Sequence, residues 1–307
     1  MPGLALAYHM RIRDVQSYEF VRKGLLQAKN ILWLRDGKKV QRIQQAQSVE
    51  ELIDFAPSAS GLGEITWFER MRHYGPEVIA WIAEALRQAA QIPLEKERKV
   101  TFNILISELR WRGTAGADAL VENFDALDDY GKCLACVALG LSGAHAAADM
   151  IWDYSLAARA ARQWDALTGA LLGLIDLQDA RAGEALADLL SEGFEFYELY
   201  GFLARAGDRR AFVPLASRIS ALQQDHKMKD ELKDAMVAML AIAHRTGRQA
   251  VIDEFKHFSG DDDAQHEESV DQILQIPENY VAIHFAEFFR GFELGDFEKA
   301  IDQITDR

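Results

Sequence analysis

Apolar residues along the middle of the chain follow a pattern that occurs six times. In residues 204–219, Asp208 follows a glycine and precedes Ala211, Leu215 and Ile219, which fall on one face of a helix. The same offsets of +3, +7 and +11 fit starts at five other positions: Gly75, Gly113, Ala144, Asp179 and Gly247. Fifteen of the 18 positions are apolar, where composition predicts about half. The pattern therefore predicts a buried stripe on each of six helices.

Another apolar stretch with helical spacing precedes each start, such as "KCLACVALGLSG" and "DELKDAMVAMLAIAHRTG". It ends in glycine or a short polar turn, so each pair of stretches predicts an αα-hairpin. One hairpin cannot bury its apolar face alone, whereas stacked hairpins bury it continuously. The starts are separated by 29 to 39 residues, which lies within the range of helical repeats. We therefore predict an all-α fold with about six stacked hairpins over residues 65–258.

Two of the phrases, "LARAGDRRAFVPLASRI" and "LIDLQDARAGEALADLL", resemble HEAT repeats in the short bacterial form first noted in phycobilin lyases. Pro214 stands where that family often has a helix-bending proline. The resemblance covers about two-thirds of the chain and implies a right-handed α-solenoid. It implies little about function, because the family includes scaffolds, lyases and nucleic-acid enzymes.

The two ends of the chain differ from this array. Residues 1–64 are expected to form a helical extension, with Ser48 and Glu51 spaced as a capping box and "APSASGLGE" as a linker. Residues 259–307 begin with the charged stretch "SGDDDAQHEES" and then predict two closing helices. The phrase "GDFEKAIDQI" resembles a tetratricopeptide repeat. We interpret this last part as an acidic C-terminal helical cap.

Charge is spread unevenly over a chain whose formal net charge is −14. Residues 251–307 hold 15 acidic and 4 basic residues, whereas residues 1–45 hold 9 basic and 3 acidic ones. Such asymmetry can order subunits head to tail or select a charged partner, and a solubilising tail is the alternative. The basic segment "RKGLLQAKNILWLRDGKKVQR" is expected to pack on the first repeat. Docking on the next subunit is a second interpretation, and binding to a membrane or RNA ranks last.

The compartment is expected to be the cytoplasm. No apolar run reaches membrane-spanning length, and the first residues lack the basic start of a signal peptide. The two cysteines provide no disulfide framework.

Acidic residues follow the array at offsets +5 and +9, which point away from the buried stripe. These candidate partner-binding residues are Glu84, Asp118, Glu122, Asp149, Asp153, Glu184 and Asp188. In HEAT-like superhelices the second helices line the concave side, so the resemblance implies an acidic concave ridge. Such a ridge would attract a basic protein segment and repel nucleic acid. The alternative is an ordinary solvent-facing surface, since the helix dipole favours acids near a helix N-terminus.

Residues that suggest other chemistry have simpler explanations. A zinc site at Cys133 and Cys136 would need histidines from elsewhere, so both thiols are expected in the core. His257, Asp261, Asp262, Asp263 and His266 are of metal-ligand type, but their spacing matches no known site. The expected core anchors include four tryptophans: Trp81, Trp111, Trp152 and Trp164. We expect no catalytic residue, metal or cofactor.

The sequence thus predicts a non-catalytic scaffold or adaptor that binds a basic segment of a protein partner on the acidic ridge. It predicts neither nucleic-acid binding nor membrane binding, and it leaves the oligomeric state open. The alternative is a lyase or chaperone-like protein that shelters a small molecule or chromophore in the curve of the solenoid.

Overall fold

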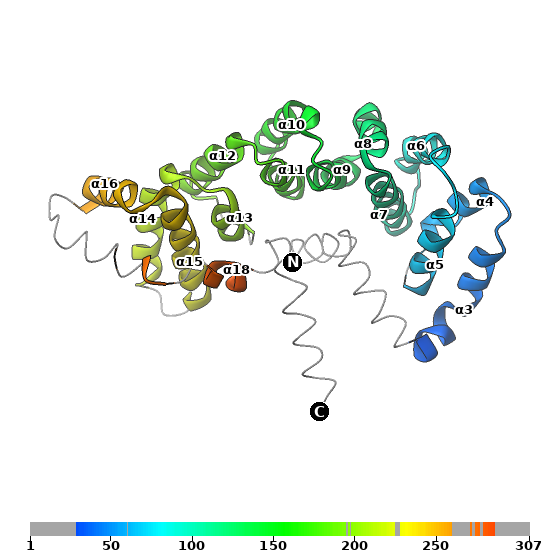
Figure 1. The fold of residues 1–307 in the computed structure, drawn as a ribbon, viewed down its shortest axis with the longest axis horizontal. Helices are drawn as coiled ribbons and strands as arrows, with labels where there is room; N and C mark the ends of the chain where they lie inside the picture. The colour runs from blue at the N-terminus through cyan, green and yellow to red at the C-terminus, as the bar shows by residue number, and fades with distance from the viewer. Residues whose placement is uncertain are drawn as a thin grey trace. The chain divides into compact units, whose positions relative to one another are not determined.

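The structure is a computed structural model, and it describes residues 29–59, 61–194, 196, 198–224, 228–259, 271, 274–276 and 279–285. All regular structure in these residues is helical, which confirms the predicted all-α class (Figure 1). Contacts divide the chain into two compact units, Met1–Leu177 and Gln178–Arg307. The boundaries predicted after residues 64 and 258 mark changes of sequence pattern and stay predictions.

The first unit is built from nine α-helices and three short 3₁₀ turns within its described residues. They are α3 (Lys29–Gln45), α4 (Val49–Asp54), η1 (Ala56–Ser58), α5 (Leu62–Met71), α6 (Val78–Ala89), α7 (Glu95–Trp111), α8 (Gly113–Glu122), η2 (Phe124–Ala126), α9 (Asp129–Leu141), η3 (His145–Ala147), α10 (Ala148–Ala160) and α11 (Trp164–Asp176).

In the second unit α13, α14, α16 and α18 all pack against α15. The described elements are α12 (Ala180–Ser191), α13 (Leu199–Ala206), η4 (Arg209–Ala211), α14 (Phe212–Leu222), α15 (Lys229–Thr246), α16 (Arg248–Ser259) and α18 (Asn279–His284). No helix in the described part of the chain is both long and apolar enough to cross a bilayer.

The predicted repeat starts agree with the observed helices. Five starts lie between the two helices of a pair, and Gly113 is the first residue of α8. The pairs are α5–α6, α7–α8, α9–α10, α11–α12, α13–α14 and α15–α16. Fourteen of the 18 stripe positions are buried, and Ile219, Ala250 and Glu254 are half-buried. The side chain of Phe258 lies outside the described residues. The buried stripes are therefore confirmed in the first five repeats, except where Ile219 is partly uncovered.

Side-chain caps begin several of these helices where the sequence predicts them. Asp208 accepts a hydrogen bond from the backbone N–H of Arg210 over 2.8 Å, just before η4 and α14. Ser48 accepts from the N–H of Glu51, as a capping box requires, but Glu51 accepts from the N–H of Gln47 instead of Ser48. Because caps satisfy helix N–H groups that lack a partner, they fix where each helix starts.

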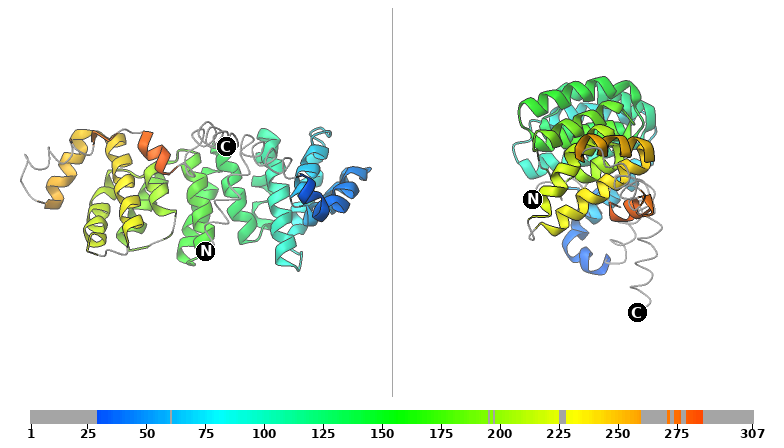
Figure 2. Two further views of the ribbon diagram at one scale, coloured as in Figure 1. Left: turned by 90° about the horizontal axis from the view of Figure 1, so that it is seen from below. Right: turned by 90° about the vertical axis from the view of Figure 1, so that its left-hand side faces the viewer.

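The first unit has two helical layers. Helices α7, α9 and α11 lie side by side and pack directly on one another, and α6, α8 and α10 form the other layer (Figures 1 and 2). Glycine allows the close approach of α9 and α11: a Cβ atom on Gly140 would lie 2.6 Å from the carbonyl oxygen of Gly173. Cys133 and Cys136 are buried free thiols on α9 at the same interface, as predicted.

The layer on the outside of the bend of the first unit consists of α6, α8 and α10 (Figure 1). These are the second helices of their pairs, so the expected placement of the acidic residues on the concave side is wrong for this unit. The physical reason is that α9 and α11 approach closely through glycine, which shortens the layer of first helices. In the outer layer, η2, which follows α8, is linked to α10 through the edge-to-face rings of Phe124 and Tyr154, 5.4 Å apart.

An arginine links successive first helices in the same way in both units. Arg112, at the end of α7, donates to the carbonyl oxygens of Met71 and Tyr74, 41 and 38 residues earlier. Arg245, in the last turn of α15, donates to the carbonyl oxygens of Ala204 and Gly207, again 41 and 38 residues earlier. Both arginines thus satisfy C-terminal carbonyls of the preceding first helix. This shared contact indicates that the two pairs of helices are equivalent repeats.

Candidate acidic docking face

Five of the seven predicted partner-binding residues lie in the first unit, on the outer helices α6, α8 and α10. We call them the acidic face: Glu84, Asp118, Glu122, Asp149 and Asp153. All five side chains are exposed. The acidic face therefore follows from the offsets in the sequence, although its position on the outside of the bend does not.

The carboxylates of the acidic face differ in whether the protein itself neutralises them. Arg87 donates to Glu84 over 2.5 Å, and this hydrogen bond is the main cause that lowers the pKa of Glu84. Asp149 also takes part in an interaction within the chain. By contrast, Asp118, Glu122 and Asp153 form no ion pair or side-chain hydrogen bond with any described residue. These three are the carboxylates that a partner could contact without displacing an internal bond.

Exposed apolar side chains accompany the acids on each outer helix. Trp81 on α6 lies three residues before Glu84, and its side chain is 47% exposed. Val121 and Leu156 each lie three residues after a carboxylate, on α8 and α10, and are 38% and 45% exposed. Residues three apart are neighbours on a helix surface. The outer helices therefore offer paired carboxylate and apolar contacts.

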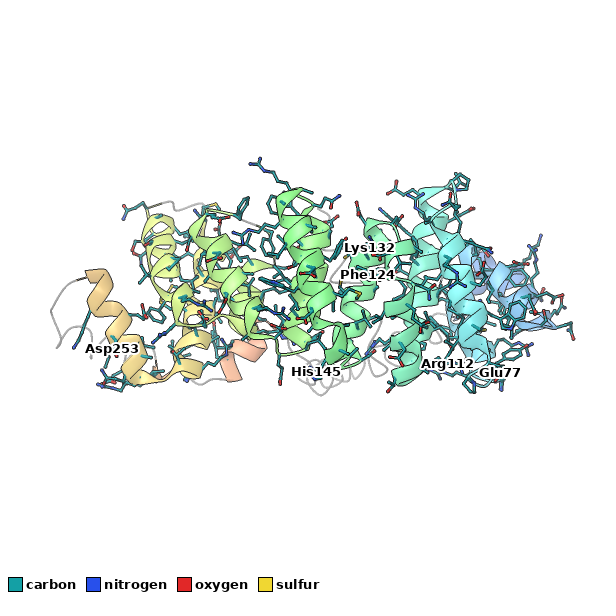
Figure 3. All side chains as sticks on the ribbon, turned by 90° about the horizontal axis from the view of Figure 1, so that it is seen from above. Glu77, Arg112, Phe124, Lys132, His145 and Asp253 are labelled. Atoms are coloured by element: carbon teal, nitrogen blue, oxygen red, sulfur yellow. The ribbon has the colours of Figure 1, made fainter. Side chains whose placement is uncertain are left out.

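Negative charge dominates around α8. Residues 113–131 contain five carboxylates and no lysine or arginine. The next residue is Lys132, whose ammonium group lies over the rings of Phe124 and Tyr154, 5.5 and 5.8 Å from their centroids (Figure 3). Of the five carboxylates, Asp118 and Glu122 lie on α8 itself, whereas Asp128 pairs with Arg98 over 2.8 Å and Asp129 accepts from Gln163 over 2.8 Å.

The other two predicted residues belong to the second unit. Glu184 and Asp188 are exposed on α12. Arg210 forms an ion pair with Glu184 over 2.9 Å, and Asp188 also takes part in an interaction within the chain. The five carboxylates of the first unit thus lie on its outer helices and the two of the second unit on α12, and one continuous ridge of all seven stays a prediction.

Two other sequence predictions have clear outcomes in the described residues. Trp81 and Trp164 are exposed and Trp111 and Trp152 are half-buried, so the expectation of four core tryptophans is wrong for the first two. No cluster of three or more metal-ligand side chains occurs in the part of the chain that the structure describes. The candidate loop ligands at 261–263 and 266, and the side chain of His257, lie outside that part.

The exposed apolar residues of this surface were not predicted from the sequence. Their positions in the sequence could have indicated their exposure. Trp81, Val121 and Leu156 fall outside the buried stripe of their helices, and each lies three residues from a predicted acidic residue. No protein-family model, curated protein or solved structure matches the chain.

Proposed function

We propose that this protein is a non-catalytic scaffold that binds a basic, amphipathic segment of a partner protein on the acidic face. The observation that carries the proposal is the set of three exposed carboxylates without an internal partner: Asp118, Glu122 and Asp153. Exposed Val121 and Leu156 next to them add apolar contact area. A partner segment with alternating cationic and apolar side chains would complement both features.

We also propose that the architecture is a right-handed solenoid of HEAT-like hairpins. The order of the paired helices and the burial of the repeated stripe support this proposal. The equivalent contacts of Arg112 and Arg245 support it as well. Repeat arrays of this kind present extended surfaces formed by successive helices, which suits recognition of a long peptide segment.

The strength of such docking is set by several weak contacts acting together. An exposed ion pair contributes about 0.2–1 kcal/mol, so three pairs contribute roughly threefold to 160-fold in affinity. Apolar contacts with Val121 and Leu156 would add to this. The interaction should therefore be salt-sensitive and lose much of its electrostatic part at high ionic strength.

The proposal is tested with a fluorescent amphipathic peptide of lysine and leucine in a helical repeat. The variant Asp118→Lys/Glu122→Lys/Asp153→Lys reverses the three carboxylates without an internal partner. We expect its affinity in fluorescence anisotropy to fall at least about tenfold, because attraction becomes repulsion. Far-UV circular dichroism confirms that the variant keeps its helical fold.

A matched control separates the acidic face from the overall net charge. The variant Glu50→Lys/Asp54→Lys/Glu97→Lys makes the same change in net charge at exposed residues on α4 and α7. We expect it to lose less than about threefold in affinity. Equal weakening by both variants would show that the peptide responds to net charge alone, and the proposal would fail.

A second candidate function is the binding of a small molecule, as in a lyase or chaperone-like protein. It is favoured by an apolar groove of about 470 Å³ on the second unit. The groove is separate in sequence from the acidic face, so the two functions can be tested independently.

A further inference from the structure

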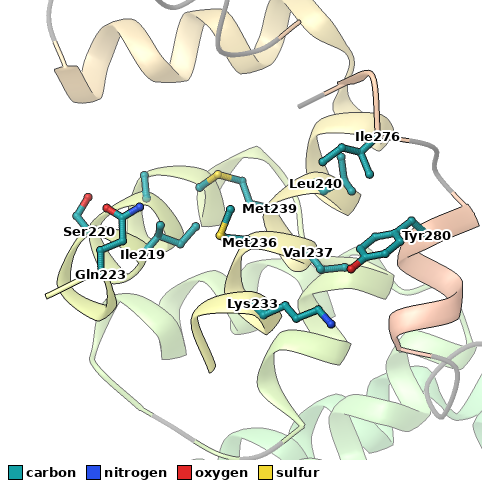
Figure 4. A pocket seen from close by; sticks show the side chains of 11 residues that line it. Ile219, Ser220, Gln223, Lys233, Met236, Val237, Met239, Leu240, Ile276 and Tyr280 are labelled. Carbon is teal, nitrogen blue, oxygen red and sulfur yellow. The ribbon is translucent and has the colours of Figure 1, made fainter. Parts of the chain in front are cut away.

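Helices α14 and α15 leave an apolar groove uncovered on the second unit (Figure 4). Its volume is about 470 Å³. Ser220 and Gln223 lie at one end, and Ile276 and Tyr280 lie at the other. The groove has no part in the acidic face, and it raises the question of what covers it.

The groove arises because two helices turn matching faces toward it. On α14 the lining residues include Ala216, Ile219 and Gln223, and on α15 they include Met236 and Leu240. The lining positions of each helix follow the i, i+3, i+4, i+7 spacing of a single helix face. Ile219 is the residue of the α14 stripe that is only half-buried, so this stripe is partly exposed to solvent here.

Two apolar side chains that line the groove are largely exposed. Met236 is 52% exposed and Ile276 is 42% exposed. Methionine side chains adapt their shape to a ligand because they are unbranched and polarisable. Met236 and Met239 together therefore give the groove an adaptable apolar lining.

One cation lines the groove and is free to bind an anion. Lys233 forms no ion pair or hydrogen bond with any residue that the structure describes. In the described structure no ion pair joins Lys233 to Asp230, three residues earlier on α15. Two other neighbouring carboxylates are engaged elsewhere: Glu231 accepts from Arg218 over 2.6 Å, and Asp234 bonds His284 over 2.6 Å. An anionic group at Lys233 would thus meet an ammonium group that these two carboxylates do not already neutralise.

The groove has the size and the lining of a small-molecule site. Ligand sites usually enclose about 300–1,000 Å³, with mostly apolar walls and few polar groups, and this groove lies in that range. A small ligand can bring one anionic group to Lys233 and place the rest of its surface on the apolar floor.

We propose that the groove binds a small amphiphilic carboxylate. Its aliphatic chain lies over the apolar floor formed by Met236, Val237 and Leu240, and its carboxylate pairs with Lys233. Ser220 and Gln223 end the apolar lining at the far side and so limit the length of the chain that fits. Because the ligand needs both parts, neither a short carboxylate nor an uncharged chain should bind as well.

The probe is octanoate, titrated into the full-length protein by calorimetry below its micelle concentration. We expect saturable binding of octanoate, at least about tenfold weaker binding of octanol and no binding of acetate. The variant Lys233→Gln should lower the affinity for octanoate about tenfold, to that of octanol. Met236→Glu should abolish binding, because it places a carboxylate in the apolar floor.

The matched control is Lys229→Gln, which removes an exposed lysine on the same helix that does not line the groove. We expect it to change octanoate affinity less than about twofold. Absence of saturable octanoate binding would overturn the proposal. Equal losses in the two lysine variants, or full binding by Met236→Glu, would overturn it as well.

Discussion

A buried carboxyl group at the end of α7 determines much of the local chemistry of the first unit. Glu108 is 1% exposed and bonds the guanidinium of Arg112 through one oxygen, while its other oxygen has no hydrogen-bond partner in the described structure. Burial raises the pKa of Glu108 above its usual 4.5, against the opposing charge of Arg112. Arg112 also caps carbonyls of the α5 end (Figure 3). This glutamate therefore holds an arginine that joins two helices, at some cost in desolvation.

This arrangement predicts a defined pH dependence of stability. Glu108 stays protonated to a higher pH in the folded protein than in the unfolded chain. Its contribution to the free energy of unfolding therefore falls as pH rises from 4.5 through the raised pKa. The variant Glu108→Gln does not titrate. We expect its free energy of unfolding, relative to the wild type, to rise by up to about 1.4 kcal/mol for each pH unit crossed in that window.

Urea unfolding at a series of pH values provides the measurement. The exposed residue Glu97 provides a control. The free energy of unfolding of Glu97→Gln, plotted against pH, should run parallel to that of the wild type. A parallel curve for Glu108→Gln would contradict the raised pKa.

At the level of elements, the close contact between α9 and α11 depends on glycine. A Cβ atom on Gly173 would lie 2.5 Å from the carbonyl oxygen of Cys136, and one on Gly169 would lie 2.5 Å from the sulfur of Cys133. Backbone atoms cannot move away as a flexible side chain can, so close helix packing requires glycine at position 173.

Replacement of Gly173 by alanine should therefore destabilise the protein by about 1–3 kcal/mol. Alanine in a helix interior normally stabilises relative to glycine by up to about 1 kcal/mol, so the steric term has to outweigh this gain. Urea unfolding with an unchanged m-value measures the difference.

Gly63 on α5 is the matched control for this substitution. Its added Cβ would meet mainly the side chain of Lys39, with the Cδ atom at 2.6 Å, and that side chain can shift. We expect Gly63→Ala to be neutral or slightly stabilising. A neutral Gly173→Ala variant would contradict the role assigned to the glycine contact.

The order of the helices could be predicted from the sequence, because caps such as Asp208 and stripes such as Ala211 and Leu215 are local features. The side of the bend could not be predicted, since it depends on which glycines of α9 and α11 face each other. The exposure of the acidic residues also follows from their offsets. Their pairing does not: the bond between Arg210 and Glu184 joins two elements, and only the fold brings them together.

At the level of the whole molecule, two surfaces with different chemistry lie in different units. The first unit carries the acidic face with exposed apolar neighbours, and the second carries the apolar groove with Lys233. A net charge of −14 gives long-range attraction for any cationic partner, but it does not by itself select a binding face. In the proposed function, Asp118, Glu122 and Asp153 and the apolar side chains near them would provide this selectivity.

The most direct test of the scaffold function is affinity capture from native cell extract at low and high salt, followed by mass spectrometry. It compares the wild type with the acidic-face triple variant and with the control triple variant of equal charge. We expect the wild type and the control to retain a basic protein at low salt, and the acidic-face variant not to retain it. Salt at 1 M should release this protein, because the Debye length falls to about 3 Å. Retention of the same proteins by all three, or retention indifferent to salt, would contradict docking on the acidic face.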